Sequence, residues 1–339
     1  MLFVLVPLAL LAAAFFYQTI SAARDRHVHP PPGRLIQVGN ARLHLHEQGQ
    51  GSPIVVLEAG IGASSLSWAL VQPKIAAFAR VISYDRAGLG WSAASEVPRS
   101  VDGMISELRS LLLQARAELP YVLVGHSFGG LLIRAYAALY PQDVAGLVLV
   151  DPVSVKAWAD CPQPELRRLL LGVKLSKRGA WAARFGLVRG SLALLVAGRR
   201  WFPKHIARLG GRQGTTAMTN LIAEVRKLPP EVWPLVRSHW SDPKCFLAMA
   251  AYLHCLPECA RRTVEMPVRG RPMVILSAAT AKQEELDERD EWIKQSGCGK
   301  HIQVPESGHW LHLEHPELVV EAVQEVINMG VRHSTSYGL

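Results

Sequence analysis

Six short runs of β-forming residues recur along the chain, and stretches with helical spacing separate most of them. The runs are PIVVLEA (53–59), RVISYD (80–85), YVLVGH (121–126), GLVLVD (146–151), PMVILS (272–277) and HIQVPE (301–306). Apolar runs of this length are typical of strands that are buried on both faces, as in a parallel sheet covered by helices. This order of elements predicts an α/β fold with a doubly wound, mostly parallel sheet and right-handed crossovers.

The stretches between the runs predict the helices that cover this sheet. The expected helices are 67–79, 100–118, 128–140, 282–296 and 316–329. Before the first run, two short segments alternate apolar and polar side chains on either side of Gly39 and Asn40, which predicts an antiparallel pair of strands at 34–38 and 41–49. The pair and the six runs together give eight strands.

A segment of about 120 residues between Pro152 and Arg271 interrupts this alternation, and it is too long for a simple crossover. Its pattern is mostly helical, so we expect 152–270 to form a helical lid inserted after the sixth strand. Residues 34–151 and 271–330 then form the core domain. Within the lid, 181–202 has an apolar middle bracketed by arginine and aromatic residues, as in helices at a membrane interface or in helices packed on a core.

The positive charge of the chain belongs to this insertion. The net charge is +9, and 152–270 alone contains 20 Lys and Arg against 7 Asp and Glu. No nucleic-acid-binding motif accompanies these basic residues, which are mixed with leucine and tryptophan, so we expect no nucleic acid partner. A membrane surface or a lipid-like substrate suits the mixture better, and a solvated cationic face is the alternative.

Residues 2–20 contain no charged side chain and are close to the roughly 20 residues that a helix needs to cross a bilayer. We expect 1–23 to be a membrane anchor outside the globular fold. A cleavable signal peptide is the alternative, because Ser21 and Ala23 have the spacing of a cleavage site. Arg24 and Arg26 favour a cytoplasmic main domain, but an aspartate lies between them, so the orientation stays open.

The cysteines do not indicate a disulfide framework or a metal site. There are five of them, and their spacing alone establishes no pairing. His254, Cys255 and Cys259 are close in sequence, but a fourth ligand at zinc-like spacing is missing. We therefore expect no metal, and no other cofactor is implied.

Ser127 lies in GHSFGG, between a strand-like run and the helix-like LLIRAYAALY. A serine on a sharp strand-to-helix turn takes a strained conformation, and glycines two positions away, Gly125 and Gly129, remove the collisions that such a turn causes. The hydroxyl would lie at the carboxyl edge of the sheet and at a helix N-terminus, whose amides can face a developing negative charge. This context indicates a nucleophile.

A nucleophilic serine needs a base within hydrogen-bond reach and a third group that orients the base. Of the 13 histidines, His309 in ESGHW follows the last strand in a glycine-containing loop at the same edge of the sheet. It is the predicted base. His44 and His46 fall on an early strand, and His126 points away from Ser127 by strand alternation, so we expect structural roles for these three.

Four stretches, LEAGIG, SYDRAGLGWS, VGHSFGG with the downstream LVLVDP, and SGHW, resemble the α/β-hydrolase superfamily in its lid-bearing branch of esterases, lipases and related serine hydrolases. The resemblance covers 34–330. It implies an α/β-hydrolase fold, Ser127 as nucleophile, His309 as base, and an oxyanion hole formed by the backbone amides of Ile61 and Phe128. Many relatives read His-Gly where this chain has Ala-Gly, which leaves the backbone donor in place.

The acid that orients the base has two candidate positions. Many family members carry it shortly after the strand that corresponds to PMVIL, but no carboxylate occurs there before Glu284. Asp151 ends the strand LVLVD, where some lipases of the superfamily place their acid. We predict Asp151, with Asp287, Glu284 and Glu285 as alternatives.

These features predict a membrane-associated serine hydrolase that cleaves an ester or related acyl bond of a lipophilic small molecule through an acyl-enzyme intermediate. Peptidase, acyltransferase, perhydrolase and C–C hydrolase chemistry remain open, as does a non-catalytic binding protein on this fold. Dehalogenases and soluble epoxide hydrolases of the superfamily carry aspartate in place of Ser127 and are disfavoured. Asp85 and Arg86, in YDRAGLG, are expected to form an ion pair or to hold their loop, without a catalytic role.

Overall fold

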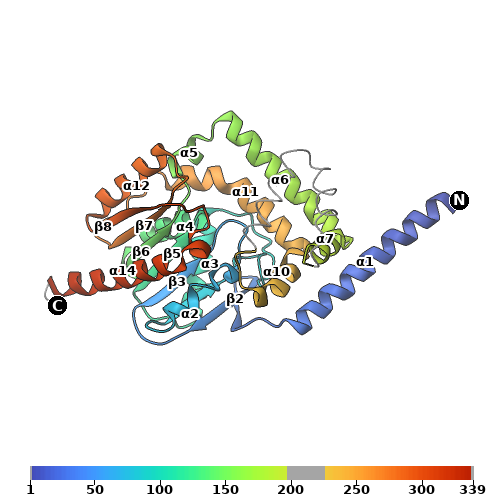
Figure 1. Ribbon diagram of the computed structural model, residues 1–339, viewed down its shortest axis with the longest axis horizontal. Helices are drawn as coiled ribbons and strands as arrows, with labels where there is room; N and C mark the ends of the chain where they lie inside the picture. Colours follow the sequence, from blue (N-terminus) through green and yellow to red (C-terminus); the bar gives the residue numbers. More distant parts are fainter. Residues whose placement is uncertain (1, 197–225, 337–339) are drawn as a thin grey trace.

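Eight strands form one sheet in the order β1-β2-β4-β3-β5-β6-β7-β8. The structure is a computed structural model that describes residues 2–196 and 226–336 (Figure 1). The strands are β1 (Arg34–Val38), β2 (Ala41–Gln48), β3 (Ile54–Glu58), β4 (Val81–Tyr84), β5 (Tyr121–His126), β6 (Val144–Val150), β7 (Met273–Ala278) and β8 (Gly299–Val304). β2 is antiparallel to both β1 and β4, and all the other neighbours are parallel. The predicted doubly wound, mostly parallel sheet is confirmed.

Alternate side chains of each buried strand belong to two different cores, because successive residues of a strand point to opposite faces. In β3, Ile54 and Val56 join the core under the helices on one face, and Val55 and Leu57 join the core on the other. The first core is covered by α3 (Val101–Gln114), α4 (Phe128–Leu139) and α12 (Gln283–Ser296), and the second by α2 (Gln72–Ile75), α13 (Leu311–Glu314) and α14 (Pro316–Ser336).

The helix expected at 67–79 is replaced by the 3-10 helix η1 (Ser65–Trp68), a turn and the single-turn helix α2. Trp68, Val71 and Ile75 are fully buried, so the helical spacing of their side chains reflected burial. Pro73 lies in the first turn of α2 and has no N–H to continue a helix from the preceding residues. Two short turns therefore bury the same side chains without a continuous helix.

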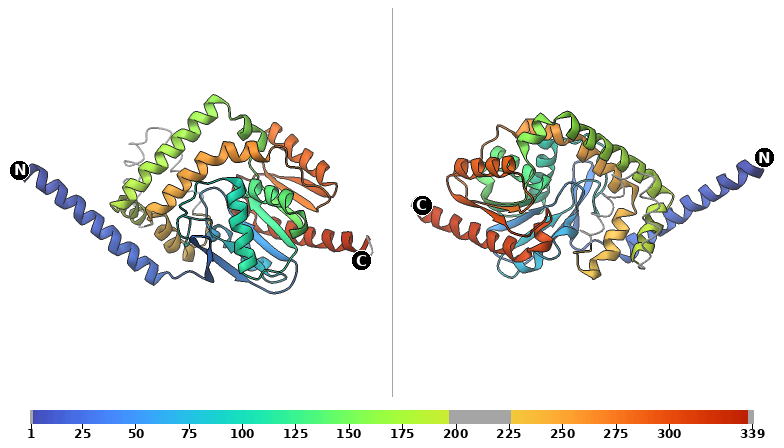
Figure 2. Two further views of the ribbon diagram at one scale, coloured as in Figure 1. Left: turned by 180° about the vertical axis from the view of Figure 1, so that it is seen from behind. Right: turned by 45° about the horizontal axis from the view of Figure 1, so that its top comes forward.

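The segment between β6 and β7 supplies helices that lie over the carboxyl edge of the sheet (Figure 2). They are α5 (Val155–Asp160), α6 (Gln163–Arg184), α7 (Leu187–Val196), the 3-10 helix η3 (Pro230–Val232), α10 (Trp233–Trp240) and α11 (Pro243–Thr263). The stretch 181–202, expected as a helix at a membrane interface or packed on the core, falls on the end of α6 and on α7, and its last residues lie outside the described part. We call α5 to α11 the lid.

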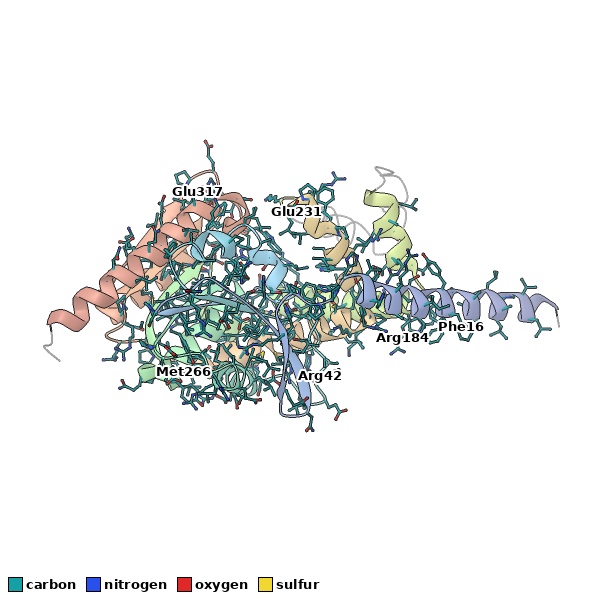
Figure 3. The ribbon with its side chains drawn as sticks, turned by 90° about the horizontal axis from the view of Figure 1, so that it is seen from below. Phe16, Arg42, Arg184, Glu231, Met266 and Glu317 are labelled. Carbon is teal, nitrogen blue, oxygen red and sulfur yellow. The ribbon has the colours of Figure 1, made fainter. Side chains whose placement is uncertain are left out.

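The N-terminal segment forms one long helix, α1 (Leu2–Val28), which is long and apolar enough to cross a membrane by length and composition. Its N-terminal part projects from the body beyond Phe16, which is labelled in Figure 3. Its second half contacts the lid, where Gln18 is buried and its Nε2 donates to the carbonyl of Ser241 at 2.8 Å. The expectation that all of 1–23 lies outside the globular fold is therefore wrong at its C-terminal end.

A buried ion pair holds the turn after β4. Asp85 accepts hydrogen bonds from His44 Nδ1 at 2.9 Å and from the backbone amides of Ser65 and Trp91. Burial alone would raise the pKa of Asp85, but the hydrogen bond and the charge of His44 outweigh it and lower this pKa to about 2. The expected pair between Asp85 and Arg86 does not form, because each pairs with another residue.

We expect Asp85→Asn to lower the free energy of unfolding by about 3 kcal/mol or more, since it leaves His44 buried without its counter-ion. Because the pKa of Asp85 is depressed, its contribution is complete above the ordinary value of 3.8 and is lost as the pH falls through about 2. Urea unfolding measures both effects. The matched control is Asp290→Asn, which breaks the half-exposed pair with His301 and should cost less than about 1 kcal/mol. Equal losses in the two variants would contradict the assignment.

Candidate active site

Ser127 occupies the turn between β5 and α4 with φ of 55° and ψ of −118°. This conformation is strained for a residue with a side chain, and neighbouring backbone holds it, because the amide of Ser127 donates to the carbonyl of Val150 at 3.0 Å. A Cβ added to Gly129 would lie 2.4 Å from the carbonyl oxygen of Glu58, and one added to Gly125 would lie 2.6 Å from Gly129. Gly125 and Gly129, on either side of Ser127, thus allow the backbone of the β5–α4 turn to pack against itself and against β3.

Three of the predicted site residues lie within hydrogen-bond distance of one another. His309 Nε2 is 3.0 Å from Ser127 Oγ, and His309 Nδ1 is 2.6 Å from Asp151 Oδ2. The serine follows β5, the aspartate follows β6, and the histidine is in the loop after β8. Parallel strands end at the same edge of the sheet, so residues far apart in sequence meet there.

Asp151 is held from its other side by Arg289 of α12, a residue for which the sequence analysis assigned no role. Arg289 Nη1 donates to Asp151 Oδ1 at 3.0 Å, and the amide of Ala278 donates to the same oxygen at 3.1 Å. Burial raises the pKa of Asp151, but the hydrogen bond with His309 and the charge of Arg289 outweigh burial and lower it. Asp151 is therefore ionised near neutral pH.

The alternative acids on α12 face elsewhere. Asp287 is exposed and accepts a hydrogen bond from Gln283 Nε2 at 2.8 Å, and Glu284 is also exposed. Glu285 accepts from the amide of Lys282 at the start of α12. The hydrogen bonds of Glu285 and Asp287 are local to α12 and the residue before it, whereas the carboxylate of Asp151 contacts His309.

The loop after β3 passes directly beside Ser127. A Cβ added to Gly60 would lie 3.7 Å from the Cβ of Ser127, and Ile61 follows with its side chain partly buried. Phe128 is the first residue of α4, where backbone amides have no acceptor within the helix. The two predicted oxyanion donors, the amides of Ile61 and Phe128, thus belong to segments that adjoin the serine.

A buried arginine restrains this loop. Arg86 donates to the carbonyl of Ala59 at 2.6 Å and to that of Gly60, and it pairs with the carboxylate of Glu58. Its guanidinium carbon lies 5.1 Å from the centre of the Tyr252 ring of the lid. From the sequence, Arg86 was expected to pair with Asp85 or to hold its own loop. In the structure, Arg86 holds the loop after β3.

Two further histidines pack behind His309. His126 Nε2 donates to the carbonyl oxygen of His309 at 2.8 Å, and the rings of His126 and His312 lie 4.3 Å apart. Burial lowers the pKa of His126 well below its ordinary value and that of His312 to about 3. Both rings are therefore neutral near pH 7, and His126 restrains the backbone of His309.

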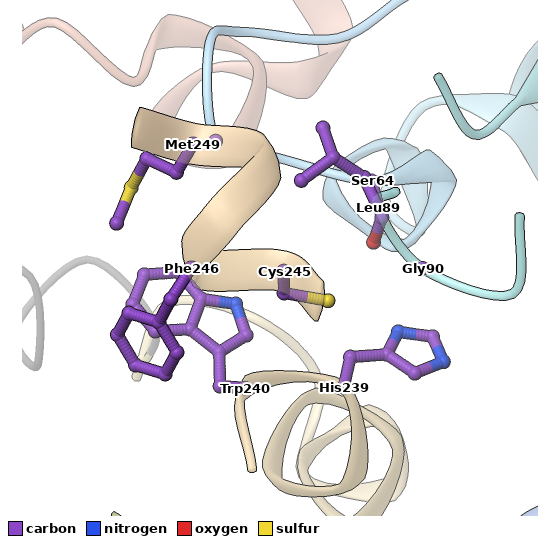
Figure 4. A pocket seen from close by; sticks show the side chains of 9 residues that line it. Ser64, Leu89, Gly90, His239, Trp240, Cys245, Phe246 and Met249 are labelled. Atoms are coloured by element: carbon purple, nitrogen blue, oxygen red, sulfur yellow. The ribbon is translucent and has the colours of Figure 1, made fainter. Parts of the chain in front are cut away.

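A pocket next to the loop after β3 is closed by the lid (Figure 4). Its lining is neutral: Gly62, Ser64, Leu89, Gly90, His239, Trp240, Cys245, Phe246 and Met249. Burial lowers the pKa of His239 to about 4 and raises that of Cys245 to about 12, so neither is charged near pH 7. The ring nitrogen Nδ1 of His239 has no hydrogen-bond partner among the residues that the structure describes. The pocket suits an uncharged group.

No cluster that could hold a metal ion occurs among the described residues. Cys255 and Cys259 are buried on α11, where Cys255 Sγ donates to the carbonyl of Tyr252 at 3.3 Å. These two cysteines pack in the core under the lid.

We expect Gly129→Ala to destabilise the protein by about 1–3 kcal/mol, because its methyl group would collide with the backbone of Glu58 and Ala59. Gly190→Ala is the matched control: its methyl group meets nothing within 4 Å, and alanine favours the helix by about 0.5–1 kcal/mol. Thermal unfolding of both variants measures the difference. If Gly129→Ala were as stable as Gly190→Ala, the result would contradict the close contact between Gly129 and the backbone of Glu58 and Ala59.

Known proteins share this fold and part of this sequence. The 2-hydroxy-6-oxo-2,4-heptadienoate hydrolase of Pseudomonas putida is 33% identical over 133 residues, which cover 38% of this chain and 48% of that protein. In the first curated relatives the match spans about half of their length or less. An esterase from Thermogutta terrifontis aligns with a TM-score of 0.57 and 20% identity, covering 87% of this chain and 97% of that one. The enol-lactonase from Burkholderia xenovorans LB400 aligns with a TM-score of 0.58 and 17% identity, covering 87% and 100%.

The two structural likenesses concern the fold, since their sequence identity is low. The model of the alpha/beta hydrolase family matches residues 54–322, which is most of the chain and includes β3 to α14 on both sides of the lid. The chain belongs to the alpha/beta hydrolase family.

Proposed function

We propose that this protein is a serine hydrolase that cleaves an ester or related acyl bond of a lipophilic, uncharged small molecule. The observation that carries the proposal is the continuous hydrogen-bonded series from Ser127 Oγ through His309 to Asp151. Such a series makes a weakly nucleophilic alcohol reactive, because the imidazole accepts its proton and the carboxylate stabilises the resulting imidazolium.

In the proposed reaction, His309 Nε2 removes the proton of Ser127 while the serine oxygen attacks the substrate carbonyl. The amides of Ile61 and Phe128 donate to the oxyanion that forms. His309 then gives its proton to the leaving alcohol, which leaves an acyl-enzyme. A water molecule, activated by the same imidazole, hydrolyses this intermediate and restores the serine.

Asp151 would fix the tautomer of His309 by accepting from Nδ1–H. Arg289 has a positioning role, since it holds the carboxylate oxygen that does not face the histidine. Arg86 has a similar role at the loop after β3, because it holds the carbonyls that precede the amide of Ile61.

Gly62 and Ser64 of the pocket lie in the loop that carries the amide of Ile61, so we take this pocket as part of the substrate-binding region. Its neutral lining favours an uncharged substrate. The Pseudomonas putida relative is named for a substrate that is a carboxylate, and a carboxylate is usually held by Lys or Arg side chains. No Lys or Arg is among the described residues that line the pocket. An acyl ester or lactone without charge therefore fits better than an anionic acid.

We also propose that α1 is retained as a membrane anchor. Cleavage after Ala23 would remove Gln18, whose side chain is buried against the lid. A signal peptide is discarded and has no such requirement for specific contacts in the mature protein.

Ser127→Ala should abolish hydrolysis of p-nitrophenyl butyrate and labelling by a fluorophosphonate probe, because both require the serine oxygen. The matched control is Ser191→Ala on α7, where the hydroxyl donates to the backbone carbonyl of Leu187; this variant should keep both activities. Gel fluorescence reads the labelling and absorbance reads the turnover. Unchanged labelling of Ser127→Ala would refute the nucleophile.

Asp151→Asn should lower kcat by about four orders of magnitude, the loss seen when an amide holds the imidazole in the wrong tautomer. Asp287→Asn, at an exposed position of α12, should leave kcat unchanged. The same ester assay compares the two, with fluorophosphonate labelling rates as a second measurement. A loss confined to Asp287→Asn would move the acid to α12.

A further inference from the structure

The N-terminal helix is joined to the lid by buried polar contacts. Arg189 of α7 donates from Nε to Gln18 Oε1 at 2.9 Å and from Nη1 to Asp25 Oδ2 at 2.5 Å, and its side chain is only 8% exposed. Gln18 and Asp25 are two helical turns apart and lie on one face of α1. Buried polar groups with several defined partners fix an orientation, so α1 and the lid form one unit.

Contacts with the lid begin three residues earlier along α1. The rings of Phe15 and Phe185 lie 6.5 Å apart, and a Cβ added to Gly186 would be 3.3 Å from the ring of Tyr17. These contacts therefore leave residues 2–14 of α1 as the part that does not touch the lid. At about 1.5 Å per residue, 2–14 forms a helix of about 20 Å, which is shorter than the hydrocarbon core of about 30 Å.

This difference in length has a geometric consequence for the lid. If α1 crosses the bilayer while it keeps its contacts with Arg189 and Phe185, residues 15–20 must also lie at membrane depth. The corner where α6 meets α7 lies beside these residues, so it must enter the membrane–water interface. In Figures 1 and 2, α1 leaves the body next to α7, and α6 extends from the same corner along the outside of the lid.

The outer face of α6 has the chemistry of such an interface. Five exposed residues, which we call the α6 outer face, recur at intervals that place them on one side of the helix: Lys174, Lys177, Arg178, Trp181 and Arg184. Trp181 is 61% exposed, and the nearby Leu187 is 54% exposed. Basic residues with tryptophan and leucine are typical of helices that lie among lipid headgroups.

The charge of this face has no counterpart within the described part of the protein. None of its four basic residues takes part in an ion pair there, whereas Arg189, one turn beyond the face, is paired with Asp25. Anionic headgroups would supply the missing charge, and the exposed Trp181 and Leu187 have the amphipathic and apolar side chains that suit the boundary between headgroups and acyl chains.

We propose that the α6 outer face lies in the headgroup layer of an anionic bilayer, at a depth that the docked helix α1 imposes. The lid thereby becomes part of the membrane surface. The proposal goes beyond the hydrolase chemistry and rests on the anchor role of α1.

Lysine footprinting of the full-length protein tests the proposal. The protein, in detergent or incorporated into nanodiscs of phosphatidylcholine alone or with phosphatidylglycerol, is treated with acetic anhydride and analysed by mass spectrometry. We expect Lys174 and Lys177 to be acetylated several-fold less in the anionic discs than in detergent. The exposed Lys74 of α2 and Lys294 of α12 are internal controls and should react equally in both. If Lys174 and Lys177, relative to Lys74 and Lys294, reacted as fast in the anionic discs as in detergent, the proposal would be overturned.

Fluorescence quenching by brominated phosphatidylglycerol gives an independent reading. The fraction of tryptophan fluorescence that is quenched should fall in Trp181→Phe, because this variant removes the tryptophan that we place among the lipids. It should also fall in the charge-reversal variant Lys174→Glu/Lys177→Glu/Arg178→Glu but not in the matched Lys74→Glu/Lys294→Glu. Quenching that does not change in Trp181→Phe would contradict the proposal.

These outcomes are separate from the proposed chemistry. Failure of the protein to enter nanodiscs would overturn the anchor and the α6 surface together, while ester hydrolysis by the same protein in detergent would still test Ser127. Loss of hydrolysis with normal footprints would overturn the enzyme proposal alone.

Discussion

The site depends on close contact between backbones where α4 crosses β3. Gly129 lies against the carbonyls of Glu58 and Ala59, so any side chain there would force α4 away from the sheet. The same contact fixes the strained turn of Ser127, whose amide bonds to the end of β6. One packing constraint therefore sets the relative positions of the serine, the loop beside it and the strand that ends at Asp151.

Buried cations then hold the surrounding loops. Arg86 joins Glu58 to the carbonyls of the loop after β3. Arg289 joins Asp151 to the hydroxyl of Ser277 near the end of β7 and to the carbonyl of Pro152. A charge removed from water is tolerated only with a partner of opposite charge and satisfied hydrogen bonds. Because each arginine contacts both a carboxylate and backbone carbonyls, it restrains a loop as well as neutralising a charge.

The sequence was most informative where local pattern and topology act together. The strands were predictable because their apolar runs are continuous, and Ser127 and His309 were predicted from strand ends that share one edge of a parallel sheet. Asp151 was predicted from the resemblance to lipases that carry their acid at this strand end. Arg86 and Arg289 could not be assigned partners, since their contacts join elements whose spacing only the folded chain defines. The stretch 67–79 was predicted as a helix because burial imitates helical spacing, although Pro73 indicated a break.

The contact among Gln18, Asp25 and Arg189 links the first element of the chain to the middle of the lid. In a homologue without the N-terminal helix, an arginine at position 189 would lose the partners that Gln18 and Asp25 provide. Positions 18, 25 and 189 should therefore vary together in evolution. We expect homologues that lost the helix to carry an uncharged residue at position 189. In such proteins no N-terminal helix would hold the lid at a membrane.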